Sequence, residues 1–238
     1  MKNLTLLFFL ILPFIGFSQE TKNKLESGVS FSLNSNGIAP IPAFSLDKPA
    51  LIASASFKLG RFSYSPTLAY ALDMKPWYID NWFHYRIVEQ AKFELKTGIN
   101  FSTFLTNYHT VEEDILKGER YLALSLTGTT SISKRSSIIV DYWNDNGLEK
   151  GSISGHFFDL IYNRSNMRIG DDFSWSANLM FFYINYDGEN DGLFFSPTFS
   201  LATDKFPLTF YWQATQAIST NISDVPGFRW NVGLSYTL

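Results

Sequence analysis

The ionisable residues whose spacing best suits chemistry fall in two neighbouring segments of the chain. They are His84 and Arg86 in residues 81–88, and Lys92, Glu94 and Lys96 in residues 92–101. A spacing of two places side chains on one face of a β-strand. A turn centred on Gln90 would set Arg86 opposite Glu94, as in a cross-strand pair. The same register would set His84 opposite Lys96. Asp141 and Asp159, in two later segments, extend this charged face.

Two interpretations of the charged face remain open. Rings of charged side chains along a water-filled path act as a selectivity element. The same groups can also fill the interior of a narrow barrel as an ion-pair network. The choice depends on the elements that position these residues.

Those elements are predicted by period-two alternation of apolar and polar residues between turn signals. The pattern predicts twelve strands: Gly28–Asn34, Leu51–Leu59, Phe62–Leu72, Asn81–Val88, Lys92–Phe101, Arg120–Ser131, Ser137–Trp143, Ser154–Tyr162, Phe173–Tyr183, Leu193–Ala202, Leu208–Ala217 and Phe228–Leu238. Alternation is weakest in Ser154–Tyr162. Pro66 and Pro197 fall inside two strands and predict a β-bulge at each. An even strand number is typical of single-chain bacterial barrels.

The connections between these strands sort by length and by charge. The long ones, Ser35–Ala50, Leu105–Glu119 and Ile218–Gly227, all follow odd-numbered strands and are predicted to face outside. Connections on that side are acidic: Glu112-Glu113-Asp114, Asp145, Asp187, Glu189 and Asp191. Connections on the periplasmic side are short and basic: Arg61, Lys134-Arg135, Arg164, Arg168 and Lys205. The turn Asn163–Asp171 is the exception, because it is longer than this parity predicts.

The final strand carries the most specific motif. Phe228, Trp230, Val232, Leu234, Tyr236 and Leu238 fall on one face. The last eight residues resemble the C-terminal sorting strand of bacterial outer-membrane barrels, with signal positions Asn231, Gly233, Tyr236 and Leu238. Leu238 stands where phenylalanine is usual. An edge strand of a soluble sandwich is the alternative, but such an apolar edge invites aggregation.

The resemblance implies an all-β fold, a transmembrane antiparallel up-and-down β-barrel of about 12 strands. The aromatic, cysteine-free composition is similar to that of small outer-membrane barrels of Bacteroidota. Outer-membrane lipid, and the barrel-assembly machinery during biogenesis, are the implied partners. The implied location is the outer membrane of a Gram-negative cell.

The amino terminus predicts export to the same compartment. Met1-Lys2-Asn3 is a short basic start, and an apolar run from Leu4 to Ile15 follows. Gly16-Phe17-Ser18 supplies small residues before a cleavage point. The run is too short for a membrane-spanning helix. The chain is therefore divided into a signal peptide, residues 1–18, and a barrel domain, residues 19–238.

Composition narrows the function classes. The chain has 238 residues, of which 17% are aromatic, and no cysteine, so no disulfide or thiolate chemistry is expected. A net charge of −3 gives no basic footprint for nucleic acid. Aromatic residues near strand ends are Trp77, Tyr78, Trp82, Tyr85, Tyr142 and Trp143. Interfacial girdles explain them more simply than a carbohydrate platform does.

The three histidines give little support for catalysis. They are scattered without metal-ligand spacing, so neither a metal nor a cofactor is predicted. Twelve-stranded outer-membrane phospholipases carry a His-x-Ser-Asn-Gly run, whereas Phe-Phe-Asp-Leu follows His156. A nucleophile also needs an oriented base within reach, and no such set is evident. His156 is interpreted as an interfacial aromatic residue, and the chain is predicted not to be an enzyme.

Three functions are carried forward. The first is a narrow channel for small polar solutes, lined by His84, Arg86, Lys92, Glu94, Lys96 and Asp141. The second is a closed barrel that serves as a structural or accessory subunit beside other outer-membrane proteins. The third is a lipid-modifying outer-membrane enzyme.

Overall fold

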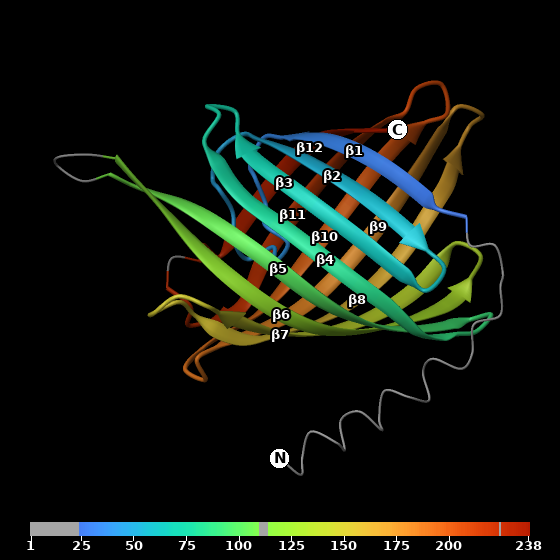
Figure 1. Ribbon diagram of the computed structural model, residues 1–238. Coiled ribbons are helices and arrows are strands. Elements are labelled where there is room, and N and C mark those ends of the chain that lie inside the picture. The colour runs from blue at the N-terminus through green and yellow to red at the C-terminus, as the bar shows by residue number, and fades with distance from the viewer. Residues whose placement is uncertain (1–23, 110–113, 224) are drawn as a thin grey trace, which may run out of the picture.

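The computed structural model describes residues 24–109, 114–223 and 225–238, which form a closed barrel of twelve antiparallel strands without a helix (Figure 1). The strands are β1 Glu26–Asn34, β2 Ala50–Leu59, β3 Phe62–Ala71, β4 Pro76–Glu89, β5 Phe93–His109, β6 Asp114–Ser133, β7 Ser136–Gly147, β8 Ser154–Ile169, β9 Phe173–Tyr186, β10 Asn190–Thr203, β11 Leu208–Thr220 and β12 Phe228–Thr237. Each pairs with its neighbours in sequence, and β1 pairs with β12. The predicted fold class is confirmed. The predicted signal peptide lies outside the described residues.

Alternation along each strand separates an apolar outer surface from the interior. In β6, Leu124 and Leu126 are exposed, whereas Ala123, Ser125 and Thr127, which alternate with them, are buried. The same two-residue period recurs around the wall, because successive side chains of a strand point to opposite faces. No helix in the described residues is long and apolar enough to cross a membrane. The exposed apolar belt is the surface that lipid covers in a barrel of this kind.

The two rims of the barrel differ. We call the rim with the connections after β1, β5 and β11 the loop end, and the opposite rim the turn end. The strands exceed their predicted bounds mainly at the loop end, where β4 begins at Pro76 and β5 continues to His109. At the turn end, β8 continues to Ile169 and reaches β9 through a three-residue turn that contains Gly170. The predicted long turn Asn163–Asp171 was therefore wrong, and every connection after an even-numbered strand has two to four residues.

The hairpin of β5 and β6 projects beyond the rest of the loop end (Figure 1). These two strands have 17 and 20 residues, against 9 in β1 and 10 in β2. Pairing continues without a shift from Phe93 opposite Thr130 to His109 opposite Asp114. Most of the predicted loop Leu105–Glu119 is therefore strand, and residues 110–113 lie outside the described part.

The strand prolines are accommodated without the predicted bulges. Pro66 keeps its partner Asn81 on β4, while the pairing of β3 with β2 is interrupted at that point and resumes in the same register. Pro197 likewise keeps Leu179 on β9 and is unpaired toward β11. Proline lacks the N–H donor for one ladder only, so each strand loses pairing on one side and the barrel keeps its register.

Candidate functional site

The connection after β1 enters the barrel instead of extending into solvent. In this inserted loop, residues 35–49, the side chains of Ile38, Ala39 and Ala43 are buried. The loop forms its own small hairpin: Leu46 N donates to Gly37 O at 2.8 Å, and Ala39 N donates to Phe44 O at 3.0 Å. Several of its backbone donors are therefore satisfied within the loop, which lowers the cost of burying the chain in the bore.

Polar residues of β12 hold the inserted loop. The Arg229 guanidinium donates to Ala43 O, and its Nη2 lies 3.3 Å from Asp47 Oδ2. Asn231 Oδ1 accepts a 3.0 Å hydrogen bond from Asn36 N. Both β12 side chains are buried. Because an unpaired buried arginine is costly, the loop and Arg229 stabilise one another.

A layer of phenylalanines fills the bore beside the inserted loop. Phe157, Phe182 and Phe194, here called the phenylalanine layer, come from the adjacent strands β8, β9 and β10 and are fully buried with Ala43. The ring centroids of Phe157 and Phe182 are 5.7 Å apart, and those of Phe182 and Phe194 are 4.9 Å apart. These three rings are the largest fully buried side chains among the described residues, and they lie outside the predicted charged face.

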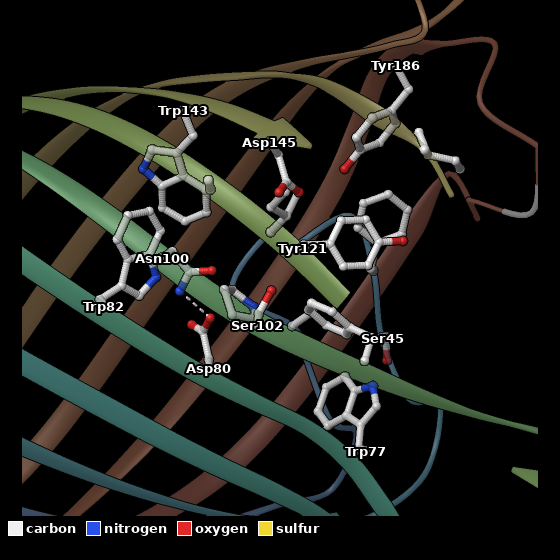
Figure 2. Close-up of a pocket in the computed structure, with 17 residues that line it drawn as sticks. Ser45, Trp77, Asp80, Trp82, Asn100, Ser102, Tyr121, Trp143, Asp145 and Tyr186 are labelled. Atoms are coloured by element: carbon white, nitrogen blue, oxygen red, sulfur yellow. Dashed lines mark hydrogen bonds between the residues drawn. The ribbon is translucent and has the colours of Figure 1, made fainter. Parts of the chain in front are cut away.

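An aromatic cavity lies between the inserted loop and the wall formed by β4 to β7 (Figure 2). Its volume is about 270 Å³. Six of its rings are Trp77, Trp82, Phe104, Tyr121, Trp143 and Tyr186. Trp82 and Trp143 contact each other, with centroids 4.9 Å apart. The volume is slightly below that of drug-sized ligand pockets, about 300–1,000 Å³, so the aromatic cavity fits a small solute.

Two carboxylates face the aromatic cavity. Asp80 on β4 is buried and accepts a 2.5 Å hydrogen bond from Asn100 Nδ2 on β5. Asp145 on β7 points into the cavity from the opposite side, beside Tyr121 (Figure 2). The sequence placed Asp145 in an acidic outer connection. That assignment was wrong, because β7 continues to Gly147 and carries Asp145 on its inner face.

The aromatic residues interpreted as a membrane girdle divide into two groups. Trp77, Trp82 and Trp143 line the aromatic cavity, and Tyr78 is buried against Trp77. For these four residues the girdle interpretation was wrong. Tyr85 packs on Phe62, and Tyr142 is exposed on the outer surface. A shift in the pairing of β3 with β4, between Ala69 and Tyr70, accompanies the burial of both Trp77 and Tyr78.

The predicted charged face lies nearer the turn end. Arg86 contacts Glu89, and its Nε lies 2.9 Å from Glu94 Oε2. The predicted direct opposition was wrong, since Arg86 is opposite Lys96 and Glu94 is opposite Glu89, with a register shift between Arg86 and Val88. The ion pair is therefore diagonal. Lys92 is exposed in the turn before β5, at the rim instead of on the strand.

Two other predicted lining residues, His84 and Asp141, lie on the barrel wall farther from the turn end. His84 is opposite Gly98 instead of Lys96, and its ring stacks on Trp82 with centroids 5.1 Å apart. Asp141 accepts hydrogen bonds from Thr127 Oγ1 at 2.8 Å and from Trp143 Nε1 at 2.6 Å. Asp141 thus connects the predicted face to the aromatic cavity through Trp143.

His156 faces outward, where its Nδ1 lies 2.8 Å from the hydroxyl of Tyr142 and the two rings stack. This placement agrees with an interfacial aromatic role. Across the residues that the structure describes, no three histidine, aspartate or glutamate side chains are grouped closely enough to hold a metal ion.

The motif positions of the final strand have distinct environments. Asn231 is buried at the inserted loop, and Tyr236 is exposed on the outer face. Leu238 N donates to Val29 O at 2.8 Å, which ties the last residue to β1. Gly233 lies beneath the Tyr211 ring, where an added Cβ would come within 2.2 Å of Tyr211 Cζ. Glycine at position 233 therefore provides space for this ring.

We expect Gly233→Ala to lower the free energy of unfolding by roughly 1–3 kcal/mol, as overpacking does. Urea titration of the folded barrel, followed by tryptophan fluorescence, measures the change. Gly227→Ala is the matched control, because nothing lies within 4 Å of its added Cβ. Adding Tyr211→Ala to Gly233→Ala should recover part of the lost free energy of unfolding, because it removes the ring that clashes. A double variant as unstable as Gly233→Ala alone would contradict the steric explanation.

No protein-family model and no curated protein matches the chain in sequence. Among solved structures, the chain is similar to the KdgM porin in complex with disordered oligogalacturonate, with a TM-score of 0.59, 11% identity, and coverage of 88% of this chain and 98% of that one. It is also similar to the NanC porin, with a TM-score of 0.53, 10% identity, and coverage of 90% and 100%. A third similar structure is the COG4313 outer membrane channel from Pseudomonas putida F1, with a TM-score of 0.50, 10% identity, and coverage of 93% and 98%.

These likenesses extend over nearly the whole barrel at low sequence identity, so they establish the architecture. The closed wall, the apolar belt and the three solved structures agree. The chain has the fold of a porin-like outer-membrane β-barrel.

Proposed function

We propose that this protein is a narrow outer-membrane channel for small solutes, whose path is narrowest at the inserted loop and the phenylalanine layer. The observation that carries the proposal is the division of the bore into two cavities. The aromatic cavity occupies the loop end, and a second cavity of about 290 Å³ lies toward the turn end. Between them lies the phenylalanine layer.

The second cavity has the character of a water path. Its lining residues include Asn163, Asn178, Thr198 and Ser200. Asn178 Nδ2 donates to Asn163 Oδ1 at 2.8 Å, Ser176 Oγ accepts from Asn166 N at 3.1 Å, and Arg164 Nε donates to Met167 Sδ at 3.2 Å. Polar walls of this kind are typical of barrels whose interior is water-filled. The fold shared with porins supports the same function.

A closed accessory barrel is the second candidate, because the inserted loop and the phenylalanine layer fill the bore. In that case the same residues act as a permanent plug, and the outer surface of the barrel binds a partner protein. The two candidates make opposite predictions for ion flow through the purified protein.

We expect the purified protein to give small, discrete conductance steps in planar lipid bilayers. Matching liposomes should be permeable to small solutes and should exclude larger ones. Gel mobility with and without boiling verifies that the sample is a folded barrel. A folded sample without conductance at any voltage would reject the channel. A stable partner co-purified from native membranes would then support the accessory function.

A further inference from the structure

We propose that the aromatic cavity binds small organic cations, such as quaternary ammonium compounds, and that these are the solutes this barrel admits. The transport part of this inference rests on the proposed channel function, whereas the binding part does not. It is carried by the charge of the cavity, by its rings, and by a second pair of carboxylates farther along the bore.

The lining of the aromatic cavity contains acidic side chains and no basic ones. Asp80 and Asp145 line it, and none of its 17 lining residues is lysine, arginine or histidine. The nearby cation Arg120 is held by Glu149, with Nε and Oε1 2.6 Å apart. Asp80 and Asp145 face the same cavity from opposite sides (Figure 2). Like charges around one cavity favour a cation between them.

The hydrogen bonds of the two carboxylates leave capacity for a ligand. Asp80 is only 7% exposed and accepts side-chain hydrogen bonds from Asn100 Nδ2, at 2.5 Å, and from Trp82. Asp145 is hydrogen-bonded to the backbone of Asn146. Within the described part of the chain, no side chain donates to the Asp145 carboxylate. A buried carboxylate with spare acceptor capacity is a ready partner for a cationic group.

The rings of the cavity supply the second element of cation recognition. The ring centroids of Trp82 and Trp143 are 4.9 Å apart. The Tyr121 and Tyr186 side chains point into the cavity from the opposite side (Figure 2). Aromatic faces attract cations, tryptophan most strongly, and cages of such rings bind quaternary ammonium groups. A neutral ligand would gain ring contacts but would leave two carboxylates unneutralised.

Two further acidic side chains lie in the bore beyond the aromatic cavity. Asp141 and Asp159 stand directly opposite each other on β7 and β8, below Trp143 and Phe157. Asp159 is 3% exposed, and its Oδ1 has no hydrogen-bond partner. Lys96 interacts electrostatically with Asp141 and offsets part of this charge. A buried carboxylate oxygen without a partner is costly, and a passing cation would relieve that cost.

These features disfavour an anionic solute. The similar KdgM structure contains oligogalacturonate, which is a polyanion. The two carboxylates of this cavity would repel such a ligand, and no lining side chain would compensate its charge.

The test compares choline with its neutral isostere, 3,3-dimethylbutan-1-ol, on the full folded protein in detergent. We expect choline to quench tryptophan fluorescence saturably and the neutral compound to bind at least about tenfold more weakly. Asp145→Asn, which keeps the size of the side chain, should weaken choline binding about tenfold or more. Asp171→Asn removes the same charge from an exposed turn at the turn end and should leave binding unchanged.

Equal binding of the two compounds, or choline binding that Asp145→Asn leaves unchanged, would overturn the inference. Planar-bilayer recordings in choline chloride separate this outcome from the channel proposal. A conducting barrel that neither binds nor passes choline would refute cation recognition and leave the channel intact. A silent barrel that binds choline would support the site and reject transport.

Discussion

Replacement of residues 37–48 by a Gly-Ser linker is expected to raise single-channel conductance several-fold. The substitution withdraws Ile38, Ala39 and Ala43 from the bore, where all three are buried. Asn34 and Ala50 are paired neighbours on β1 and β2, so a short linker can join the strands without disturbing the wall. Planar-bilayer recording of the purified barrel gives the measurement.

The matched control removes the same length of chain from a different connection. Replacing residues 106–117, which lie between the paired Leu105 and Gly118 of β5 and β6, by the same Gly-Ser linker shortens the projecting hairpin. The described ends of β5 and β6 project beyond the rest of the loop end (Figure 1), so shortening them should leave conductance unchanged. If the inserted-loop variant conducts no better than the hairpin variant, the ion path does not pass the inserted loop.

Phe182→Ala is expected to lower the free energy of unfolding by about 3–5 kcal/mol, the usual cost of deleting a fully buried phenylalanine ring. Phe182 is 0% exposed and packs between Phe157 and Phe194. The substitution would leave a cavity in the centre of the layer, because the wall strands hold the neighbouring rings in place. Urea unfolding of the barrel in lipid vesicles measures the change.

The neighbouring Phe181 provides the comparison for this variant. It is 45% exposed on the outer surface of the same strand, with its ring 4.6 Å from Phe195. Phe181→Ala should cost clearly less, because the removed ring faces lipid and leaves no enclosed cavity. Equal losses for the two variants would show that the phenylalanine layer is not the stabilising core of the interior.

The architecture was predictable because period-two alternation is a local signal. Each of the twelve predicted segments coincides with a strand, and the main errors lie at the ends of strands near the loop end. There the wall rises above the apolar belt, and the contrast between lipid and water no longer imposes alternation on the sequence. β4 and β5 show this most clearly, since both extend at least five residues beyond their predicted bounds.

The phenylalanine layer has a sequence signal of its own, separate from the alternation of apolar and polar residues. Each of β8, β9 and β10 contains a phenylalanine doublet: Phe157-Phe158, Phe181-Phe182 and Phe194-Phe195. Because successive residues of a strand point to opposite faces, one ring of every doublet must point inward. Three doublets on three adjacent strands therefore indicate an aromatic layer within the bore. They also explain why the alternation in Ser154–Tyr162 was weak.

The site could not be assembled from the sequence for a different reason. The inserted loop is apolar between Gly37 and Phe44, which hints at burial, but its position depends on Arg229, almost 200 residues later. Likewise, the contact of Arg86 with Glu94 was predictable from proximity, whereas the register shift beside it was not. Long-range contacts and local irregularities lack a periodic signature, so only the folded barrel reveals Asp80 and Asp145 in one cavity.

The attachment of the inserted loop to β12 has a consequence for the order of assembly. The seam that closes the wall pairs Ser30–Asn34 of the first strand with Gly233–Thr237 of the last. Arg229 and Asn231, which hold the loop, arrive on that same last strand. Before the seam forms, the loop lacks these two anchors. Completion of the wall and obstruction of its bore are thus one event, and an incompletely assembled barrel would be leaky for both reasons at once.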